Sequence, residues 1–356
     1  MSDNKTTYIK KAKLKGFKSI KQLVEISFVQ GLNIIIGPNG SGKSNFLELV
    51  EKVVIASKEE RAQLPKIDAQ LEIIDRNLPL NIFDLKKERS FLDFRFPEEP
   101  LMTKINYNIP VLKVLDDNLS VSTYTDIIDG EIYHDGFVNF GTTIRIVSTF
   151  LLFSNFYFPK SDPEEYIKTK LTTGFNADEK ITKAKINCKA YTPIEDFRLN
   201  EGFSVKINKD NEININYLRL EFLVNGEWLD WQQLSDGTKR LFYIVAEVTA
   251  HENTIILLEE PELGVHPHQL HKLMTFLKAQ SKEKQIIIST HSPQVLNVLN
   301  SDELDRVIVA ETTEKGTAMR HLTQKQINKA QKYMASELSL GDYWLHSDLE
   351  PQNTAL

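Results

Sequence analysis

A single stretch decides the fold: Gly37-Pro38-Asn39-Gly40-Ser41-Gly42-Lys43-Ser44. It follows an apolar run at 32–36 and precedes a helix-like stretch at 45–55. This is the G-x-x-x-x-G-K-S pattern of a phosphate-binding loop, in the strand–loop–helix order that the motif requires. The glycines let the backbone curl so that consecutive N–H groups point at a phosphate, and the positive end of the following helix adds to that field. We therefore expect a triphosphate to bind here.

The residue types at the end of this loop specify the ligand further. Lys43 is suited to neutralise the β and γ oxygens as a point charge, and the Ser44 hydroxyl is suited to bind Mg²⁺. ATP and Mg²⁺ are therefore the expected cofactors, with Lys43 also counted among the catalytic groups. The expected ATP-binding residues are Gly37, Pro38, Asn39, Gly40, Ser41, Gly42, Lys43, Ser44 and Asn45.

Apolar runs elsewhere predict an α/β fold with a mostly parallel sheet. Continuous hydrophobicity is typical of strands buried on both faces, and it occurs at 32–36, 254–258, 285–288 and 306–309. A helix after the second run is predicted by one apolar stripe, Leu270, Leu273, Met274 and Leu277. Ser292 and Pro293 are predicted as the N-cap and first residue of another helix, at 294–299. Strands alternating with helices are typical of α/β proteins, here with the P-loop NTPase core.

A long insertion is expected to interrupt this core. It opens with apolar residues that we interpret as a mixed helical segment from Leu64 to Ile74, broken near Pro65. Strand-like segments follow, separated by Asp-Gly and Asn-Gly turns. The predicted division is 1–56 for the first half of the core, 57–231 for the α+β insertion, 232–325 for the second half and 326–356 for a tail.

Four motifs follow the insertion in a fixed order. The stretch Leu234-Ser235-Asp236-Gly237-Thr238-Lys239-Arg240 is predicted to begin a helix with an apolar face. The apolar run 255–260 ends in Glu259 and Glu260, and the turn Gly264-Val265-His266-Pro267 comes next. The stretch Ser289-Thr290-His291-Ser292-Pro293 places His291 at the tip of a strand. An apolar run that delivers two carboxylates to the tip of a sheet favours a catalytic role for them.

This order of motifs resembles the ATPase cassette of ABC-type proteins: Walker A, signature, Walker B, D-loop and switch histidine. The signature, Glu-Glu-Pro-Glu and the Val-His-Pro turn are most similar to the RecF/SMC branch and, within it, to the OLD-like ATPases of bacterial defence operons. Segments 16–20 and 338–345 resemble that group as well. The resemblance covers about residues 8–56 and 232–345, and is specific in the motifs.

The resemblance implies a role for each motif residue. Glu259 would hold Mg²⁺ through a water, where ABC relatives usually carry Asp. Glu260 would be the general base for the attacking water, and His291 would bond the γ-phosphate. In the family, the signature meets the γ-phosphate of a second subunit, so two ATPs lie in a head-to-tail homodimer. The implied trans signature is Ser235, Asp236 and Gly237, and the implied D-loop is Gly264, Val265 and His266.

The same resemblance implies a biological setting. We expect a nucleotide switch in a DNA-associated antiphage complex, as a dimer or a higher oligomer. OLD relatives often append a Toprim nuclease, but no Asp-x-Asp pair follows His291, so a separate effector, a nuclease, is expected. The alternative is a RecF-like repair ATPase that binds DNA directly. A transporter subunit is disfavoured, because Asp236 and Thr238 replace the Gly and Gln usual in its signature.

Several weaker signals leave alternatives open. If 9–15 is a strand, then Lys11, Lys13 and Lys15 form a basic stripe that either contacts DNA or protects a solvated edge strand. Lys18 is a candidate nucleotide contact. The group His266, His268 and His271 has poor spacing for zinc, His251-Glu252 lacks the second histidine of a zincin, and neither Gln63 nor Gln70 can be assigned as a magnesium-ligating glutamine.

Composition limits the class of protein. The 356 residues are 41% hydrophobic and 26% charged, which suits a packed core and excludes a disordered chain. The net charge of −6 argues against a uniformly basic nucleic-acid coat. One cysteine, Cys188, excludes a disulfide framework and fits a reducing compartment. Because the apolar stretch 146–158 is shorter than the roughly 18 residues that span a bilayer, we expect a cytoplasmic protein without a membrane segment.

Overall fold

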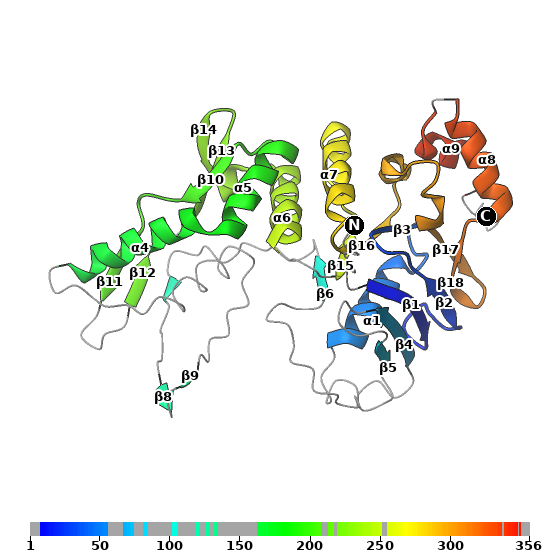
Figure 1. Ribbon diagram of the computed structural model, residues 1–356, viewed down its shortest axis with the longest axis horizontal. Coiled ribbons are helices and arrows are strands. Elements are labelled where there is room, and N and C mark those ends of the chain that lie inside the picture. The colour runs from blue at the N-terminus through cyan, green and yellow to red at the C-terminus, as the bar shows by residue number, and fades with distance from the viewer. Residues whose placement is uncertain are drawn as a thin grey trace, which may run out of the picture. The chain divides into compact units, whose positions relative to one another are not determined.

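The computed structural model describes residues 8–55, 67–74, 81–84, 102–105, 119–120, 126–128, 131–133, 162–207, 213–216, 219–250, 255–336, 338–347 and 349. The chain divides into two compact units (Figure 1). Unit 1 combines residues 1–106 with 251–356, and unit 2 is residues 107–250. The units change over at Asn106 and Ala250, whereas the sequence-based division at residues 56 and 231 stays a prediction.

The larger sheet of unit 1 has six strands in the order β18-β17-β3-β16-β15-β6. Neighbours from β17 to β6 are parallel, and β18 pairs with β17 in the antiparallel direction. Its strands are β3 (Leu32–Ile36), β6 (Met102–Ile105), β15 (Ile255–Glu259), β16 (Gln285–Thr290), β17 (Val307–Thr313) and β18 (Gly316–His321). The four predicted apolar runs correspond to β3, β15, β16 and β17, which confirms the expected mostly parallel α/β fold. Thr254 lies outside the described residues, and Arg306 ends a 3₁₀ helix.

A second, antiparallel sheet of unit 1 has the order β2-β1-β4-β5. Its strands are β1 (Tyr8–Lys15), β2 (Val24–Ser27), β4 (Asp68–Ile74) and β5 (Asn81–Asp84). Helix α1 (Lys43–Ile55) contacts strands of both sheets. One apolar core joins them, with members such as Leu14 on β1, Phe46 on α1 and Ile287 on β16. The phosphate-loop helix is therefore clamped between two sheets.

Two expectations for this sheet were wrong. Of the segment predicted as helical from Leu64 to Ile74, residues 64–66 lie outside the described residues, and 68–74 form strand β4, in which Ala69, Leu71 and Ile73 are buried in alternation. That period of two suits a strand, and pairing along β1 outweighs the weaker helical spacing in the same residues. Strand β1 is also no edge strand, because β2 and β4 flank it on either side.

The remaining helices of unit 1 lie in its C-terminal half. They are α7 (Pro267–Gln280), α8 (Gln324–Met334) and α9 (Leu340–His346), with short 3₁₀ helices η2 (Pro293–Val298) and η3 (Leu304–Arg306). The predicted stripe on α7 is buried as expected. The helix predicted at 294–299 is the 3₁₀ helix η2. Ser292 occupies its N-cap position, but its side chain accepts no capping hydrogen bond.

Unit 2 consists of helices and small antiparallel sheets. Its helices are α4 (Pro163–Ala177), α5 (Glu179–Tyr191), α6 (Asp236–Ala250) and the 3₁₀ helix η1 (Trp231–Gln233). Its strands are β7 (Leu119–Ser120), β8 (Asp126–Ile128), β9 (Glu131–Tyr133), β10 (Asp196–Leu199), β11 (Ser204–Ile207), β12 (Ile213–Asn216), β13 (Leu220–Val224) and β14 (Glu227–Asp230). Asp162 and Asp178 cap α4 and α5. None of the helices in the described ranges is long and apolar enough to cross a membrane.

Candidate nucleotide site

The phosphate loop leaves β3 at the edge where the parallel strands end. Gly40 and Gly42 have φ of 79° and 90°, which explains glycine at both positions. A Cβ on Gly42 would lie 2.0 Å from Oγ1 of Thr317, and one on Gly37 would lie 2.0 Å from the carbonyl oxygen of Ala310. The hairpin of β17 and β18 therefore packs against the loop and leaves no room for a side chain at Gly37 or Gly42.

A second contact to the loop was not foreseen from the sequence. The Ser19 hydroxyl accepts hydrogen bonds from Asn45 and from the Thr317 hydroxyl, each at 2.8 Å. Ser19 follows Lys18, whose φ is 47° and whose ammonium group pairs with Glu48 on α1. The turn of segment 16–20 thus braces the first turn of α1. A nucleotide contact for Lys18 stays a prediction.

The Lys43 side chain is buried against its own loop. Its ammonium group donates to the carbonyl oxygens of Gly37 and Pro38, both at 2.9 Å. Burial lowers the pKa of this ammonium group, and the negative charges of Glu260 and Glu262 oppose that lowering. The lysine therefore lies within the electrostatic reach of the carboxylates that follow β15.

The two Walker B carboxylates stand at the end of β15. Glu259 is its last residue and pairs in register with Ser289 of β16. Glu260 has a φ of 44°, and its backbone N–H donates to the Ser289 carbonyl at 2.8 Å. This conformation costs a non-glycine residue about 1–2 kcal/mol, so the backbone at Glu260 is strained.

The predicted switch histidine lies beside these carboxylates. Nδ1 of His291 is 3.5 Å from Oε1 of Glu260 and 3.6 Å from Oε1 of Glu262. The side chains of His291 and Glu260 are 39% and 32% exposed, so a ligand can reach both. The structure thus brings together Lys43, Glu260 and His291, which come from three separate motifs. Glu262, which the sequence reasoning left without a role, lies beside them. The available signal was the third acid of Glu-Glu-Pro-Glu.

The groups expected to hold Mg²⁺ suit that ion. Ser44 is exposed at the start of α1, and Glu259 ends the neighbouring strand half-buried. Within the described ranges, no group of three or more His, Cys, Asp or Glu side chains could hold a metal ion. Mg²⁺ in nucleotide sites takes one or two protein ligands and completes its shell with phosphate oxygens and water, so a sparse ligand set fits it.

The D-loop residues form two successive turns after Glu260. The N–H of Leu263 donates to the Glu260 carbonyl at 3.1 Å, and that of Val265 donates to the Glu262 carbonyl at 3.0 Å. Gly264 has a φ of 74°, which the second turn requires. His266 then caps α7, since its Nδ1 accepts from the N–H of His268 at 3.3 Å.

The predicted signature residues lie in unit 2, at the start of α6. Ser235 acts as the N-cap, because its hydroxyl accepts from the N–H of Thr238 at 3.2 Å and lies 2.9 Å from the Thr238 hydroxyl. Asp236 is exposed and pairs with Lys239 at 3.4 Å. The helix N-terminus presents backbone N–H groups and the positive end of the helix dipole, which suit an anion.

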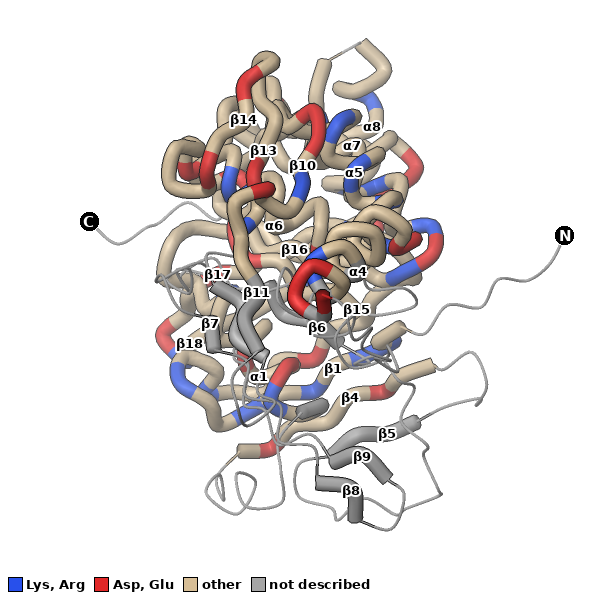
Figure 2. The backbone as a smooth tube through the Cα atoms, turned by 90° about the vertical axis from the view of Figure 1, so that its left-hand side faces the viewer, with Lys and Arg blue, Asp and Glu red and all other residues tan. Residues whose placement is uncertain are grey.

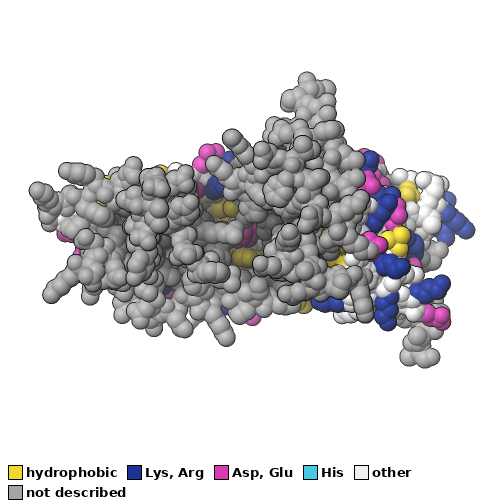
Figure 3. Space-filling view, turned by 90° about the horizontal axis from the view of Figure 1, so that it is seen from below, with side chains coloured by type: hydrophobic (Ala, Val, Ile, Leu, Met, Phe, Trp, Pro, Cys, Tyr) yellow, Lys and Arg dark blue, Asp and Glu magenta, His cyan; other side chains and the backbone are white. Residues whose placement is uncertain are grey.

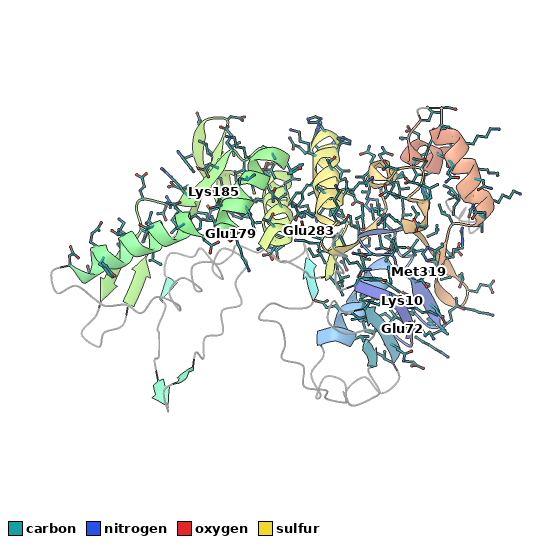
Figure 4. All side chains as sticks on the ribbon, in the orientation of Figure 1. Lys10, Glu72, Glu179, Lys185, Glu283 and Met319 are labelled. Carbon is teal, nitrogen blue, oxygen red and sulfur yellow. The ribbon has the colours of Figure 1, made fainter. Side chains whose placement is uncertain are left out.

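An aromatic cluster fixes the first turns of α6 within unit 2. The ring of Phe242 packs edge-on against Phe222 at 4.9 Å and against Phe197 at 5.2 Å between centroids. Trp231 of η1 lies 6.0 Å from the same ring. The ammonium group of Lys185, labelled in Figure 4, lies 5.6 Å from the Phe197 ring centroid. The signature turn is therefore built on a rigid core of its own.

The basic stripe on β1 shares its face with acids. In register, Lys11 faces Glu72, Lys13 faces Glu25 and Lys15 faces Asp68, so three carboxylates match three ammonium groups. Lys11 forms an ion pair with Glu25, and Glu72 is labelled on β4 in Figure 4. Both acidic and basic segments are scattered along the tube in Figure 2, and basic side chains are interspersed with acidic ones among those coloured in Figure 3.

Comparisons with known proteins point in the same direction as the geometry. Residues 168–297 match a family model described as "AAA domain, putative AbiEii toxin, Type IV TA system", and residues 11–54 match one described as "AAA domain". The second match precedes the predicted insertion at 57–231, and the first includes its residues 168–231. The fold and these matches support an ABC/SMC-type P-loop ATPase.

This chain is also similar to SMC proteins in sequence and to an Smc head in structure. A structural maintenance of chromosomes protein 3 homolog of Plasmodium falciparum is 30% identical over 34% of this chain and 10% of its own length. The chromosome partition protein Smc of Halothermothrix orenii is 31% identical over 23% of this chain and 8% of its own length. The Smc head of Pyrococcus furiosus, bound to the C-terminal domain of ScpA, superposes with a TM-score of 0.54 at 13% identity, covering 93% of this chain and 99% of that one. The chain thus shares the ABC/SMC head fold and spans a small part of these curated relatives.

Proposed function

We propose that this ABC/SMC-type head hydrolyses ATP at composite sites in a head-to-tail homodimer, as the nucleotide switch of a DNA-associated antiphage complex with a separate nuclease effector. The observation that carries the proposal is the meeting of Lys43, Glu260 and His291 where the parallel strands of unit 1 end. These are a phosphate-binding cation, a carboxylate base and a histidine, and phosphoryl transfer to water uses all three.

The chemistry follows from the positions of these side chains. Lys43 and the loop N–H groups would hold the β and γ phosphates, and Ser44 and Glu259 would bind Mg²⁺, which supplies charge neutralisation on the phosphates. Glu260 is exposed enough to accept a proton from a water molecule, and its strained backbone fixes where that carboxylate points. His291, beside Glu260, would bond the γ-phosphate or the attacking water.

Dimerisation is supported by what each half-site lacks. Unit 1 contains the proposed phosphate-binding residues, metal ligands and general base, whereas unit 2 contains the exposed helix N-terminus at Ser235, Asp236 and Gly237. A second copy placed head to tail would bring the signature of one chain to the phosphate loop of the other. ATP would then act as the bridge between two copies, and its hydrolysis would weaken the dimer.

The setting rests on the resemblance of the motifs and on the family description. That description names a putative toxin of a toxin–antitoxin system, which agrees with a defensive role. The Smc head with the same fold is bound to a domain of ScpA, a separate protein, which agrees with action through a partner. Direct DNA binding through Lys11, Lys13 and Lys15, as in the RecF-like alternative, is less well supported, because carboxylates balance that face.

A base-deficient variant tests the proposal. Glu260→Gln should bind ATP and Mg²⁺ with ordinary affinity, lose at least about 100-fold in phosphate release, and accumulate as a dimer in multi-angle light scattering. Glu311→Gln, a half-buried glutamate paired with Arg320 on the same sheet, is the matched control and should behave as the parent protein. Wild-type turnover by Glu260→Gln would remove it from the base role, and an ATP-saturated monomer would refute the dimer.

A further inference from the structure

Glu262 is a buried acid for which the proposed reaction has no use. Its side chain is 7% exposed, although it lies in the turn after β15. Its Oε1 accepts from the Thr290 hydroxyl at 2.5 Å and from the backbone N–H of His291 at 3.3 Å. Its buried Oε2 has no hydrogen-bond partner among the described residues. Burying a carboxylate is costly unless its partners compensate, so this position needs a reason.

Both donors to Glu262 belong to one short segment. Thr290 is the last residue of β16, and His291 follows it directly. The Thr290 hydroxyl also accepts from the N–H of Ser292 at 2.9 Å, so Glu262 and Thr290 together determine how the chain leaves the strand. The acid therefore fixes the backbone that carries His291 as well as standing beside the imidazole ring.

The ring of His291 faces carboxylates on one side. Its Nδ1 is 3.6 Å from Oε1 of Glu262 and 3.5 Å from Oε1 of Glu260. Both distances are longer than an ordinary N–H···O hydrogen bond. Catalytic hydrogen bonds are often long before the ligand binds and tighten with it. Glu260 is the more exposed and the more strained of the two, whereas Glu262 is held in place by two donors. Of the two carboxylates, Glu262 is therefore the better fixed and the better suited to orient the imidazole ring.

We propose that Glu262 is a positioning residue for His291: its carboxylate, held by Thr290, orients the imidazole with Nδ1–H toward the acids and leaves Nε2 for the nucleotide. The inference rests on the proposed ATP hydrolysis at this site. A carboxylate behind a histidine fixes which ring nitrogen carries the proton, and this determines what the other nitrogen can do. Lys43 is the cation whose charge interacts with both acids.

A double-mutant cycle separates positioning from general support of the fold. Glu262→Gln keeps an acceptor for Thr290 and should lower kcat about tenfold, with KM changed less than about twofold. In a His291→Ala background, the same substitution should change kcat less than about twofold, because its effect acts through the ring. Thr290→Val, which removes the anchoring hydroxyl, should follow the same pattern and serves if Glu262→Gln fails to fold. Glu311→Gln is the charge-matched control.

Equal losses in both backgrounds, or a change in KM alone, would overturn the proposal. A second readout needs no turnover, so it remains decisive if the pure protein proves not to hydrolyse ATP and the proposed function itself fails. Long-range ¹⁵N–¹H spectra of the nucleotide-free protein at mildly alkaline pH, assigned with His291→Ala, should show His291 protonated at Nδ1 in the parent and in Glu260→Ala, and at Nε2 in Glu262→Ala. Protonation at Nε2 in the parent, or at Nδ1 in Glu262→Ala, would refute the positioning role.

Discussion

The two units hold the residues of the proposed composite site by different physical means. In unit 1, the side chains of the proposed reaction lie in or after the loops that follow the parallel strands. Lys43, the first residue of α1, is buried, Glu260 is strained, and Glu262 is a buried carboxylate. In unit 2, the signature is an exposed, unstrained N-cap on a helix whose first turns pack into an aromatic cluster. The proposed reaction groups of unit 1 are therefore buried or strained, whereas the proposed recognition residues of unit 2 are exposed and unstrained.

The largest expected effect is complementation between the two units in trans. Lys43→Ala and Ser235→Arg should each lower hydrolysis at least about 100-fold, because each removes one half of every composite site. Mixed in equal amounts, the two variants form heterodimers with one intact site, so about a quarter of the parent activity should return. A coupled phosphate-release assay on the separate and mixed samples measures this.

The matched control pairs two lesions in the same unit. Lys43→Ala mixed with Glu260→Gln leaves every site damaged in any pairing, so no activity should return. Recovery in that mixture, or none in the mixture of Lys43→Ala with Ser235→Arg, would show that unit 1 and unit 2 of different chains do not share a site.

A smaller effect concerns the separate cores of the units. Phe242→Ala should destabilise unit 2 by about 3 kcal/mol, because it removes a ring from a packed cluster. Cys188 is buried on α5 in the same unit, and burial raises the pKa of its thiol, so it should react only when unit 2 opens. Alkylation of Cys188 should accelerate about 100-fold in Phe242→Ala.

The control for this prediction is the same chemical change in unit 1. Phe46 on α1 is fully buried in the core between the two sheets. Phe46→Ala should destabilise unit 1 by a similar amount and leave the alkylation rate of Cys188 near that of the parent. Equal acceleration in the two variants would mean that the units open as one body, and the contrast between their cores would lose its meaning.

The smallest effect tests the strain at Glu260. Glu260→Gly should be more stable than Glu260→Ala by about 1 kcal/mol in urea unfolding, because glycine adopts a positive φ without steric cost. Glu259 has no positive φ, so Glu259→Gly should be less stable than Glu259→Ala. If the glycine and alanine variants had the same order of stability at both positions, Glu260 would not be in a strained conformation.

The sequence predicted the parallel sheet well, because strands buried on both faces are continuous apolar runs such as 32–36 and 285–288. It failed where partners are distant in the chain. Segment 68–74 carried both a helical and an alternating pattern, and only pairing with β1 decides between them. The same pairing makes β1 an interior strand, which a local pattern of lysines cannot reveal.

The candidate site was predictable to a similar extent. The motifs placed Lys43 in the phosphate loop and Glu260 and His291 at strand ends, and the fold brings the three together. Sequence reasoning did not foresee the contacts that support them, because those contacts join separate segments. Ser19 bonds Thr317 across most of the chain, and Glu262 bonds Thr290 between two strands. Neither type of residue has a spacing signature, since a hydroxyl or a carboxylate suits many roles.

Helix α9 has a consequence for how the C-terminal segment can affect catalysis. Its Gly341 donates to Asn297 of η2, and a Cβ there would lie 2.6 Å from both Asn297 Oδ1 and the Pro293 carbonyl oxygen. The short helix η2 begins two residues after His291. Because α9 packs this closely on η2, a side chain at Gly341 should displace η2 and with it the backbone next to His291.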